Sequence, residues 1–70
     1  MSTLEFNQLL LGNADFLNPL AMTLTRDKES AKDLVQETMY KAIANSEKYN
    51  NGTNIKAWLY TIMRNIFINN

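Results

Sequence analysis

The chain has 70 residues, of which 46% are hydrophobic and 20% are charged. This balance is typical of one small globular domain, and it leaves room for a single core and no second domain. Cysteine and histidine are both absent, which excludes a disulfide framework and a thiolate metal site. We therefore expect one domain spanning 1–70.

The charges of the chain are unevenly distributed, although the formal net charge is zero. Net charge alone argues against a nucleic-acid-binding protein. All seven acidic residues lie before position 48, whereas Lys48, Lys56 and Arg64 follow without an acid among them. The last third also holds four of the seven aromatic residues. Cations interleaved with aromatic rings suit single-stranded nucleic acid, because cations contact phosphates and rings stack on bases.

The first half of the chain predicts two helical segments. Residues 4–11 are expected to form a short helix that ends near Gly12, a residue that readily adopts the left-handed cap conformation. A second segment follows over about 14–25. Pro19 either occupies the first position of a helix capped by Asn18 or kinks a longer one. We favour a helical segment with a disturbed start.

The second half predicts two further helices. Asp27 is a suitable N-cap for a helix over 28–47, and the Asn50 to Gly52 stretch then breaks it. Thr53 or Asn54 can cap a last helix over 54–70. Because this helix has no stop signal, we expect the 70 residues to be part of a longer protein. The sequence thus predicts an all-α fold, a small bundle of three or four helices.

Helical periodicity divides the 28–47 segment into two faces. The core stripe is expected to contain Ala31, Leu34, Val35, Thr38 and Ala42. The opposite face carries Asp33, Gln36, Glu37, Tyr40 and Ala44. Such a face is either a solvated acidic surface or an aromatic anchor rimmed by acids, which would suit a basic partner helix. The pattern leaves both interpretations open.

The last segment is apolar almost all the way round, which indicates that something covers its second face. Its core stripe is expected to contain Ile55, Trp58, Leu59, Ile62 and Ile66. The other side shows Lys56, Tyr60, Met63, Arg64 and Phe67, with a polar strip of Thr61, Asn65 and Asn69 between. The aromatic side either packs on other protein or binds nucleic acid, and the asparagines are either solvated or contact base edges.

No catalytic motif is present. The sequence has no glycine-rich phosphate loop, and its nearest carboxylate pair, Asp33 and Glu37, is predicted to point outward. A chain this short also cannot enclose a deep cleft. We expect no enzyme activity, no metal or other cofactor, and no small-molecule substrate. The longest apolar runs are too short to span a bilayer and the N-terminus lacks a basic signal-peptide start, so a cytoplasmic location is expected.

Two motifs stand out in the second half of the chain. The first is Asp33-Leu34-Val35-Gln36-Glu37-Thr38, and the second runs from Lys56 to Asn65 as KAWLYTIMRN. Together, at this separation, they closely resemble the region 2 domain of extracytoplasmic-function (ECF) sigma factors, which belong to the sigma-70 family of transcription initiation factors. The similarity extends over roughly 17–70.

The resemblance implies two macromolecular partners. One is core RNA polymerase, which this domain contacts through the coiled coil of the largest subunit. The matching positions are Asp33, Gln36 and Glu37, with Tyr40 beside them. The other is the non-template strand of the promoter minus-ten element. The expected DNA-binding residues are Asn50, Asn51, Thr53, Asn54, Lys56, Tyr60, Thr61, Arg64, Asn65 and Asn69.

Further family features concern the loop and the rest of the protein. The loop over 49–54 resembles the one that captures an extruded base, and Trp58 begins the family signature although periodicity turns its ring toward the core. An anti-sigma factor is an expected partner. The usual basic continuation and the second, helix-turn-helix domain are absent from these 70 residues, so we expect weak promoter binding by the chain alone. The alternative function is a helical protein–protein interaction or dimerisation module without DNA binding.

Overall fold

The computed structural model describes residues 2–50 and 52–69, and every regular element in these ranges is helical. The elements are α1 (Thr3–Asn13), α2 (Leu17–Thr25), α3 (Lys28–Ala44), the 3₁₀ helix η1 (Ser46–Lys48) and α4 (Ile55–Asn69). The predicted all-α bundle is confirmed.

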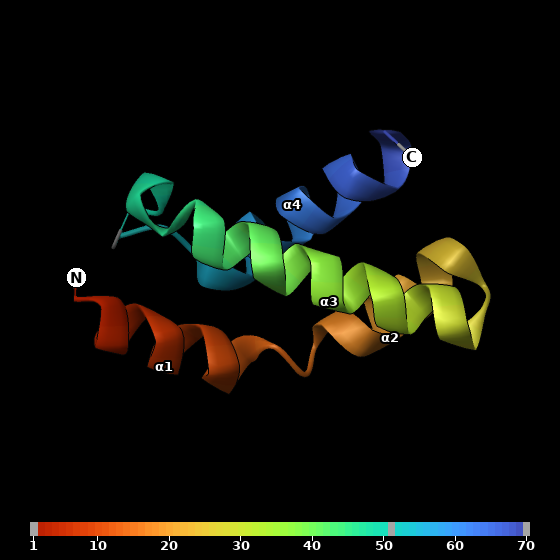
Figure 1. The fold of residues 1–70 in the computed structure, drawn as a ribbon, viewed down its shortest axis with the longest axis horizontal. Helices are drawn as coiled ribbons and strands as arrows, with labels where there is room; N and C mark the ends of the chain where they lie inside the picture. The colour runs from red at the N-terminus through yellow and green to blue at the C-terminus, as the bar shows by residue number, and fades with distance from the viewer. Residues whose placement is uncertain (1, 51, 70) are drawn as a thin grey trace.

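Helix α3 is the centre of the bundle (Figure 1). Helices α1 and α2 run one after the other along its length, and α4 crosses it at an angle, with the C-terminus on the side away from α1. Most of the packing between helices is made by α3 with α2 and by α3 with α4, while α4 also contacts α1 and α2. The molecule measures 35 × 22 × 17 Å.

Helix α1 ends near Gly12, as predicted, but not through a left-handed cap. The helix continues one residue further, to Asn13, and Ala14 after it still has right-handed backbone angles. The Asn13 side-chain amide donates to the Leu9 carbonyl at 2.8 Å, a bond within the last turn of the helix. The left-handed conformation occurs at Arg26 instead, with φ 57°, where it ends α2.

Helix α2 begins at Leu17 and not at residue 14. Pro19 is its third residue, so neither expected placement is correct: it does not follow a cap at Asn18, and it does not interrupt a longer helix. In the first turn the missing N–H of proline removes no intrahelical hydrogen bond. The start of α2 is irregular for another reason: its N-cap residue is Phe16, which makes no side-chain capping bond.

The predicted cap of α3 is confirmed. The Asp27 carboxylate accepts from the Ser30 amide at 2.8 Å, and this bond lowers the pKa of the Asp27 carboxyl below its ordinary value. The helix ends at Ala44 and not at residue 47. Both the backbone and the side-chain amide of Asn45 donate to the Lys41 carbonyl, at 3.0 and 2.8 Å. The chain then tightens into η1.

Asn54, and not Thr53, caps the last helix. Its side-chain oxygen accepts from the amides of Lys56 and Ala57, at 3.0 and 3.5 Å. The helix begins at Ile55 and is described to Asn69, while the predicted last residue, Asn70, lies outside the described residues. No helix within the described ranges is long and apolar enough to cross a membrane.

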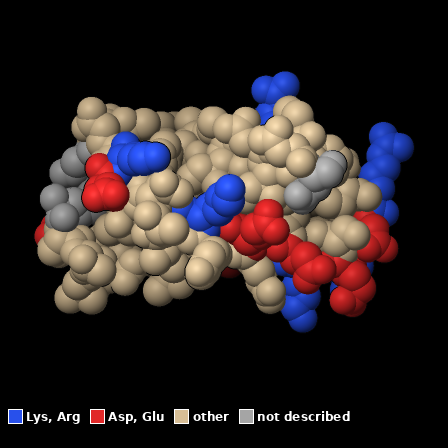
Figure 2. Space-filling view, turned by 45° about the horizontal axis from the view of Figure 1, so that its top comes forward, with Lys and Arg blue, Asp and Glu red and all other residues tan. Residues whose placement is uncertain are grey.

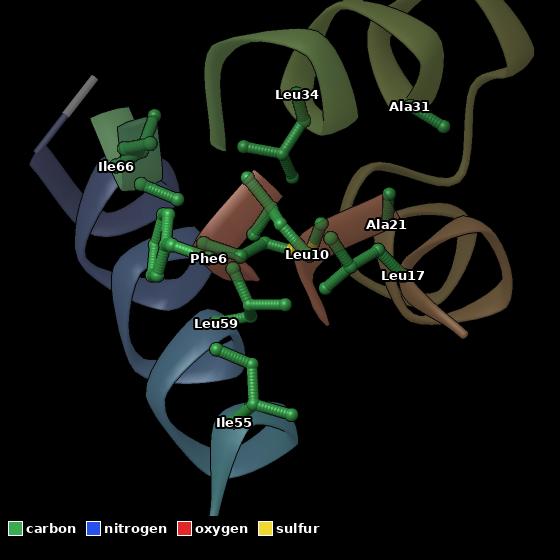
Figure 3. Packing of buried hydrophobic residues seen from close by; sticks show 11 residues of the cluster. Phe6, Leu10, Leu17, Ala21, Ala31, Leu34, Ile55, Leu59 and Ile66 are labelled. Atoms are coloured by element: carbon green, nitrogen blue, oxygen red, sulfur yellow. The ribbon is translucent and has the colours of Figure 1, made fainter. Parts of the chain in front are cut away.

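The core receives side chains from all four α-helices (Figure 3). Its buried hydrophobic residues are Phe6, Leu10, Leu17, Ala21, Ala31, Leu34, Ala42, Ile55, Leu59, Met63 and Ile66. Thr38 is also fully buried, and its hydroxyl donates to the Leu34 carbonyl at 2.7 Å. This bond satisfies a polar group that would otherwise be costly to bury.

The buried face of α4 is rotated relative to the predicted one. Met63, expected on the outer side, is 0% exposed, whereas Trp58 and Ile62, expected in the core stripe, are half-buried. Helix α4 packs against α3, α2 and α1. Its buried residues, Ile55, Leu59, Met63 and Ile66, form one stripe that includes the flexible Met63 side chain. As a result, one edge of Trp58 and Ile62 faces a surface groove.

An acidic ridge beside an amide-lined groove

The four predicted polymerase-contacting residues form an exposed ridge on α3, which we call the acidic ridge: Asp33, Gln36, Glu37 and Tyr40. Tyr40 is the most exposed large hydrophobic side chain among the described residues, at 75%. Figure 2 shows acidic side chains gathered over the first half of α3, beside a broad area without charge. The ridge thus combines negative charge with a free aromatic ring.

The two sides of the acidic ridge differ. Asp33 and Glu37 line a hollow of about 460 Å³ whose far wall is Phe67 and Ile66 of α4. Gln36 instead lines a depression between α3 and α2. The acids therefore border an apolar wall, a setting in which a cationic partner side chain could pair with carboxylate while its aliphatic stem contacts the ring.

A groove of about 320 Å³ separates the second half of α3 from α4, and we call it the amide groove. Its α4 wall carries Asn65 and Asn69. Its other wall is formed by Lys41, Asn45 and Lys48, with Glu37 at its border, and its apolar surface comes from Trp58, Ile62 and Ile66. Amides, cations and a half-buried indole thus line one depression.

The loop between η1 and α4 is closed by its own hydrogen bonds. The Thr53 amide donates to the Asn50 carbonyl at 2.8 Å, and the Gly52 amide donates to the Asn50 side chain at 3.2 Å. The Tyr49 hydroxyl donates to the Thr53 carbonyl. These bonds fold the loop into a compact turn, although the backbone around it is exposed.

The structure brings only some of the predicted DNA-binding residues together. Asn65 and Asn69 share the amide groove, whereas the other α4 candidates, Lys56, Tyr60, Thr61 and Arg64, are exposed but line no part of it. The Lys56 ammonium lies 5.7 Å from the centre of the Phe16 ring, and the Thr61 hydroxyl donates to the Ala57 carbonyl at 2.9 Å.

The predicted DNA-binding residues of the loop that the structure describes also lie outside the amide groove. Asn50, Thr53 and Asn54 are exposed. The side-chain oxygens of Asn50 and Asn54 accept backbone bonds, and their amide N–H groups make no hydrogen bond among the described residues. Asn51 lies outside the described residues.

The wall of the amide groove opposite α4 was not predicted. It is formed by Lys41 at the end of α3, by the C-cap Asn45 and by Lys48 of η1. Their spacing of four and three residues, which places side chains on one side of a helix, was a signal in the sequence. It was not sufficient, because the face only becomes a wall once α4 lies opposite. Phe6 was missed for a related reason: α1 is far from the loop in sequence but contacts it in the fold.

The all-α fold, the acidic ridge and the amide groove define a small helical domain with two adjacent polar surfaces. The Sigma-70 region 2 family model matches residues 10–70, and the chain belongs to this family. Its relatives confirm the ECF type. The chain is 41% identical over 58 residues, 83% of its length, to the ECF RNA polymerase sigma factor EcfG of Rhodopseudomonas palustris (strain TIE-1).

Two more relatives are also ECF sigma factors. The chain is 38% identical over 47 residues to the ECF RNA polymerase sigma factor SigM of Bacillus subtilis (strain 168), covering 67% of the chain. It is 31% identical over 64 residues to the ECF RNA polymerase sigma factor SigE of Mycolicibacterium smegmatis (strain ATCC 700084 / mc(2)155), covering 91% of the chain. The aligned parts represent 32%, 28% and 24% of these three relatives, so the chain corresponds to about a third or less of each.

Proposed function

We propose that this chain is the part of a transcription initiation factor that docks on core RNA polymerase and holds the melted minus-ten strand of a promoter. The mechanism is association without covalent chemistry. The acidic ridge binds the coiled coil of the largest polymerase subunit, and the amide groove with its neighbouring loop binds the non-template strand.

The amide groove carries the DNA half of this proposal. Asn65 and Asn69 lie one turn apart on α4, so their amides can donate to and accept from the edge of a base in the groove. The half-buried ring of Trp58 offers a stacking surface. Lys41 and Lys48 on the opposite wall can neutralise the phosphates on either side of that base.

The acidic ridge supports the polymerase half. Asp33 and Glu37 border an apolar wall, and Tyr40 stands free at 75% exposure. An aromatic anchor surrounded by acids is complementary to a helix that carries arginine or lysine. An anti-sigma factor that covers the ridge or the groove would compete with polymerase or with DNA for the same residues.

Substituting Asn65 tests the DNA half. In the full-length factor assembled with core polymerase, Asn65→Ala is expected to reduce promoter opening while polymerase association is unchanged, because Asn65 is outside the ridge. Permanganate reactivity of promoter thymines measures opening, and pull-down measures association. Asn18→Ala, an exposed asparagine on α2, is the matched control. Equal thymine reactivity in the Asn65 variant and the parent would contradict the proposal.

A dimerisation module is the second candidate, and the outer side of α4 favours it. Tyr60, Phe67 and Ile68 are exposed by 37%, 38% and 61%. If these residues form a homodimer interface, light scattering will give twice the monomer mass independently of concentration, and Phe67→Ser will restore the monomer. A monomer over the accessible concentration range excludes a stable dimer.

A further inference from the structure

Three aromatic rings from distant parts of the chain meet beneath the loop. They are Phe6 of α1, Tyr49 after η1 and Trp58 of α4. The ring centres of Phe6 and Tyr49 are 5.8 Å apart, those of Phe6 and Trp58 are 5.9 Å apart, and those of Tyr49 and Trp58 are 5.1 Å apart. All three pairs are tilted or edge-on, the arrangements that aromatic rings favour.

Each ring of this cluster has a different environment. Phe6 is only 4% exposed and belongs to the hydrophobic core. Tyr49 fastens the loop, since its hydroxyl donates to the Thr53 carbonyl. Trp58 forms part of the wall of the amide groove. Phe6 therefore contacts one residue that shapes the loop and another that shapes the groove, although it does not line the groove itself.

We infer that Phe6 is a positioning residue: through Tyr49 and Trp58 it holds the loop and the groove wall in the geometry that receives single-stranded DNA. This inference rests on the proposed function of the groove. Phe6 precedes the residues matched by the family model, which begin at residue 10, so this support comes from the part of α1 before the match. A preformed site binds more tightly because less conformational freedom is lost on binding.

The test compares two substitutions in α1. Phe6→Leu removes the ring but keeps an apolar side chain, and Leu10→Val alters an equally buried core residue outside the ring cluster. Binding of the 70-residue chain to a fluorescein-labelled random 12-nucleotide single strand is followed by anisotropy. Phe6→Leu removes the aromatic pairs with Tyr49 and Trp58. It is expected to weaken binding by about two- to tenfold, the range that results if the energy of one such pair is lost from binding. Leu10→Val is expected to leave binding unchanged.

Two further readouts separate positioning from general destabilisation. The Gly52 and Thr53 amides are expected to exchange with solvent faster in Phe6→Leu but not in Leu10→Val, compared at the same margin below each melting temperature. The emission of Trp58, the single tryptophan, should shift in the same variant only. Tyr49→Phe keeps the ring and removes the hydroxyl, so it should speed loop exchange with little change in emission.

The outcomes distinguish this inference from the proposed function. If Asn65→Ala weakens single-strand binding but Phe6→Leu weakens it no more than Leu10→Val does, the positioning role is wrong and the groove assignment stands. If Phe6→Leu speeds loop exchange but neither it nor Asn65→Ala alters binding, Phe6 orders a loop that does not bind DNA. The positioning role and the proposed DNA-binding function of the groove are then both overturned. Absence of any binding by the parent chain also overturns both.

Discussion

The acidic ridge and the amide groove lie side by side on α3 but are built in different ways. The ridge is the outer face of one helix, and its four residues are placed by helical periodicity alone. The groove needs two helices and the 3₁₀ turn, with walls from segments about twenty residues apart in the chain. The ridge can therefore persist wherever α3 is helical, whereas the groove exists only when α4 is docked.

Glu37 is where the two surfaces meet. It lines the hollow beside Phe67 and also the amide groove. An acid favours a basic protein partner but repels phosphate. One side chain thus has opposite electrostatic effects on the two proposed interactions, and substitutions can separate them.

The largest expected effect is the unfolding of the whole domain, including α3, when the core contact of α4 is removed. Leu59 is 0% exposed in the core, and Leu59→Ala should cost about 2 to 5 kcal/mol, which is comparable with the whole stability of a domain of this size. Thermal denaturation followed by circular dichroism measures the loss. Leu4→Ala, at a position 67% exposed, should change stability by less than about 0.5 kcal/mol.

A charge removed from the ridge should affect polymerase alone. Asp33→Asn keeps the shape of the side chain and is expected to weaken binding to core polymerase by roughly tenfold, or about 1.4 kcal/mol, with an unchanged melting temperature. Asp15→Asn, at an exposed acid before α2, is the control. Quantitative pull-down gives the affinities, and undiminished binding by the Asp33 variant would show that the ridge is a solvated acidic surface.

Glu37→Gln should move the two affinities in opposite directions. Polymerase binding is expected to weaken, while binding to a labelled single strand strengthens by about two- to fivefold, the effect of one surface charge. Anisotropy at two salt concentrations checks the electrostatic origin, because the gain should shrink as salt rises. A decrease in both affinities would mean that Glu37 acts on the groove through its shape.

The smallest effect concerns the cap that begins α3. The pKa of Asp27 is lowered by its bond from the Ser30 amide, so its stabilising contribution is present above the pKa of the unfolded chain and is lost as pH falls through the lower native pKa. Asp27→Asn can still cap the helix but cannot titrate. Its melting temperature should therefore fall less on acidification than that of the parent, and Asp15→Asn should behave like the parent.

Local signals accounted for most of the helices and for the acidic ridge. These signals were the Asp27 cap, the break near Gly52 and the apolar spacing of α3. Each depends on residues close together in the sequence, so it could be predicted from the sequence alone. Prediction failed where two local preferences competed. Gly12 was expected to adopt a left-handed cap conformation, yet it stays helical, and α1 ends one residue later at Asn13, whose side chain bonds back to Leu9.

Tertiary structure decided what the sequence pattern left open. Helical periodicity gave α4 a single core stripe, but contacts with three other helices buried Met63 and turned Trp58 and Ile62 partly toward the surface. The same docking placed Lys41, Asn45 and Lys48 opposite Asn65 and Asn69, and Phe6 against the loop. Such juxtapositions depend on how helices pack, and spacing along one helix contains no information about its neighbour.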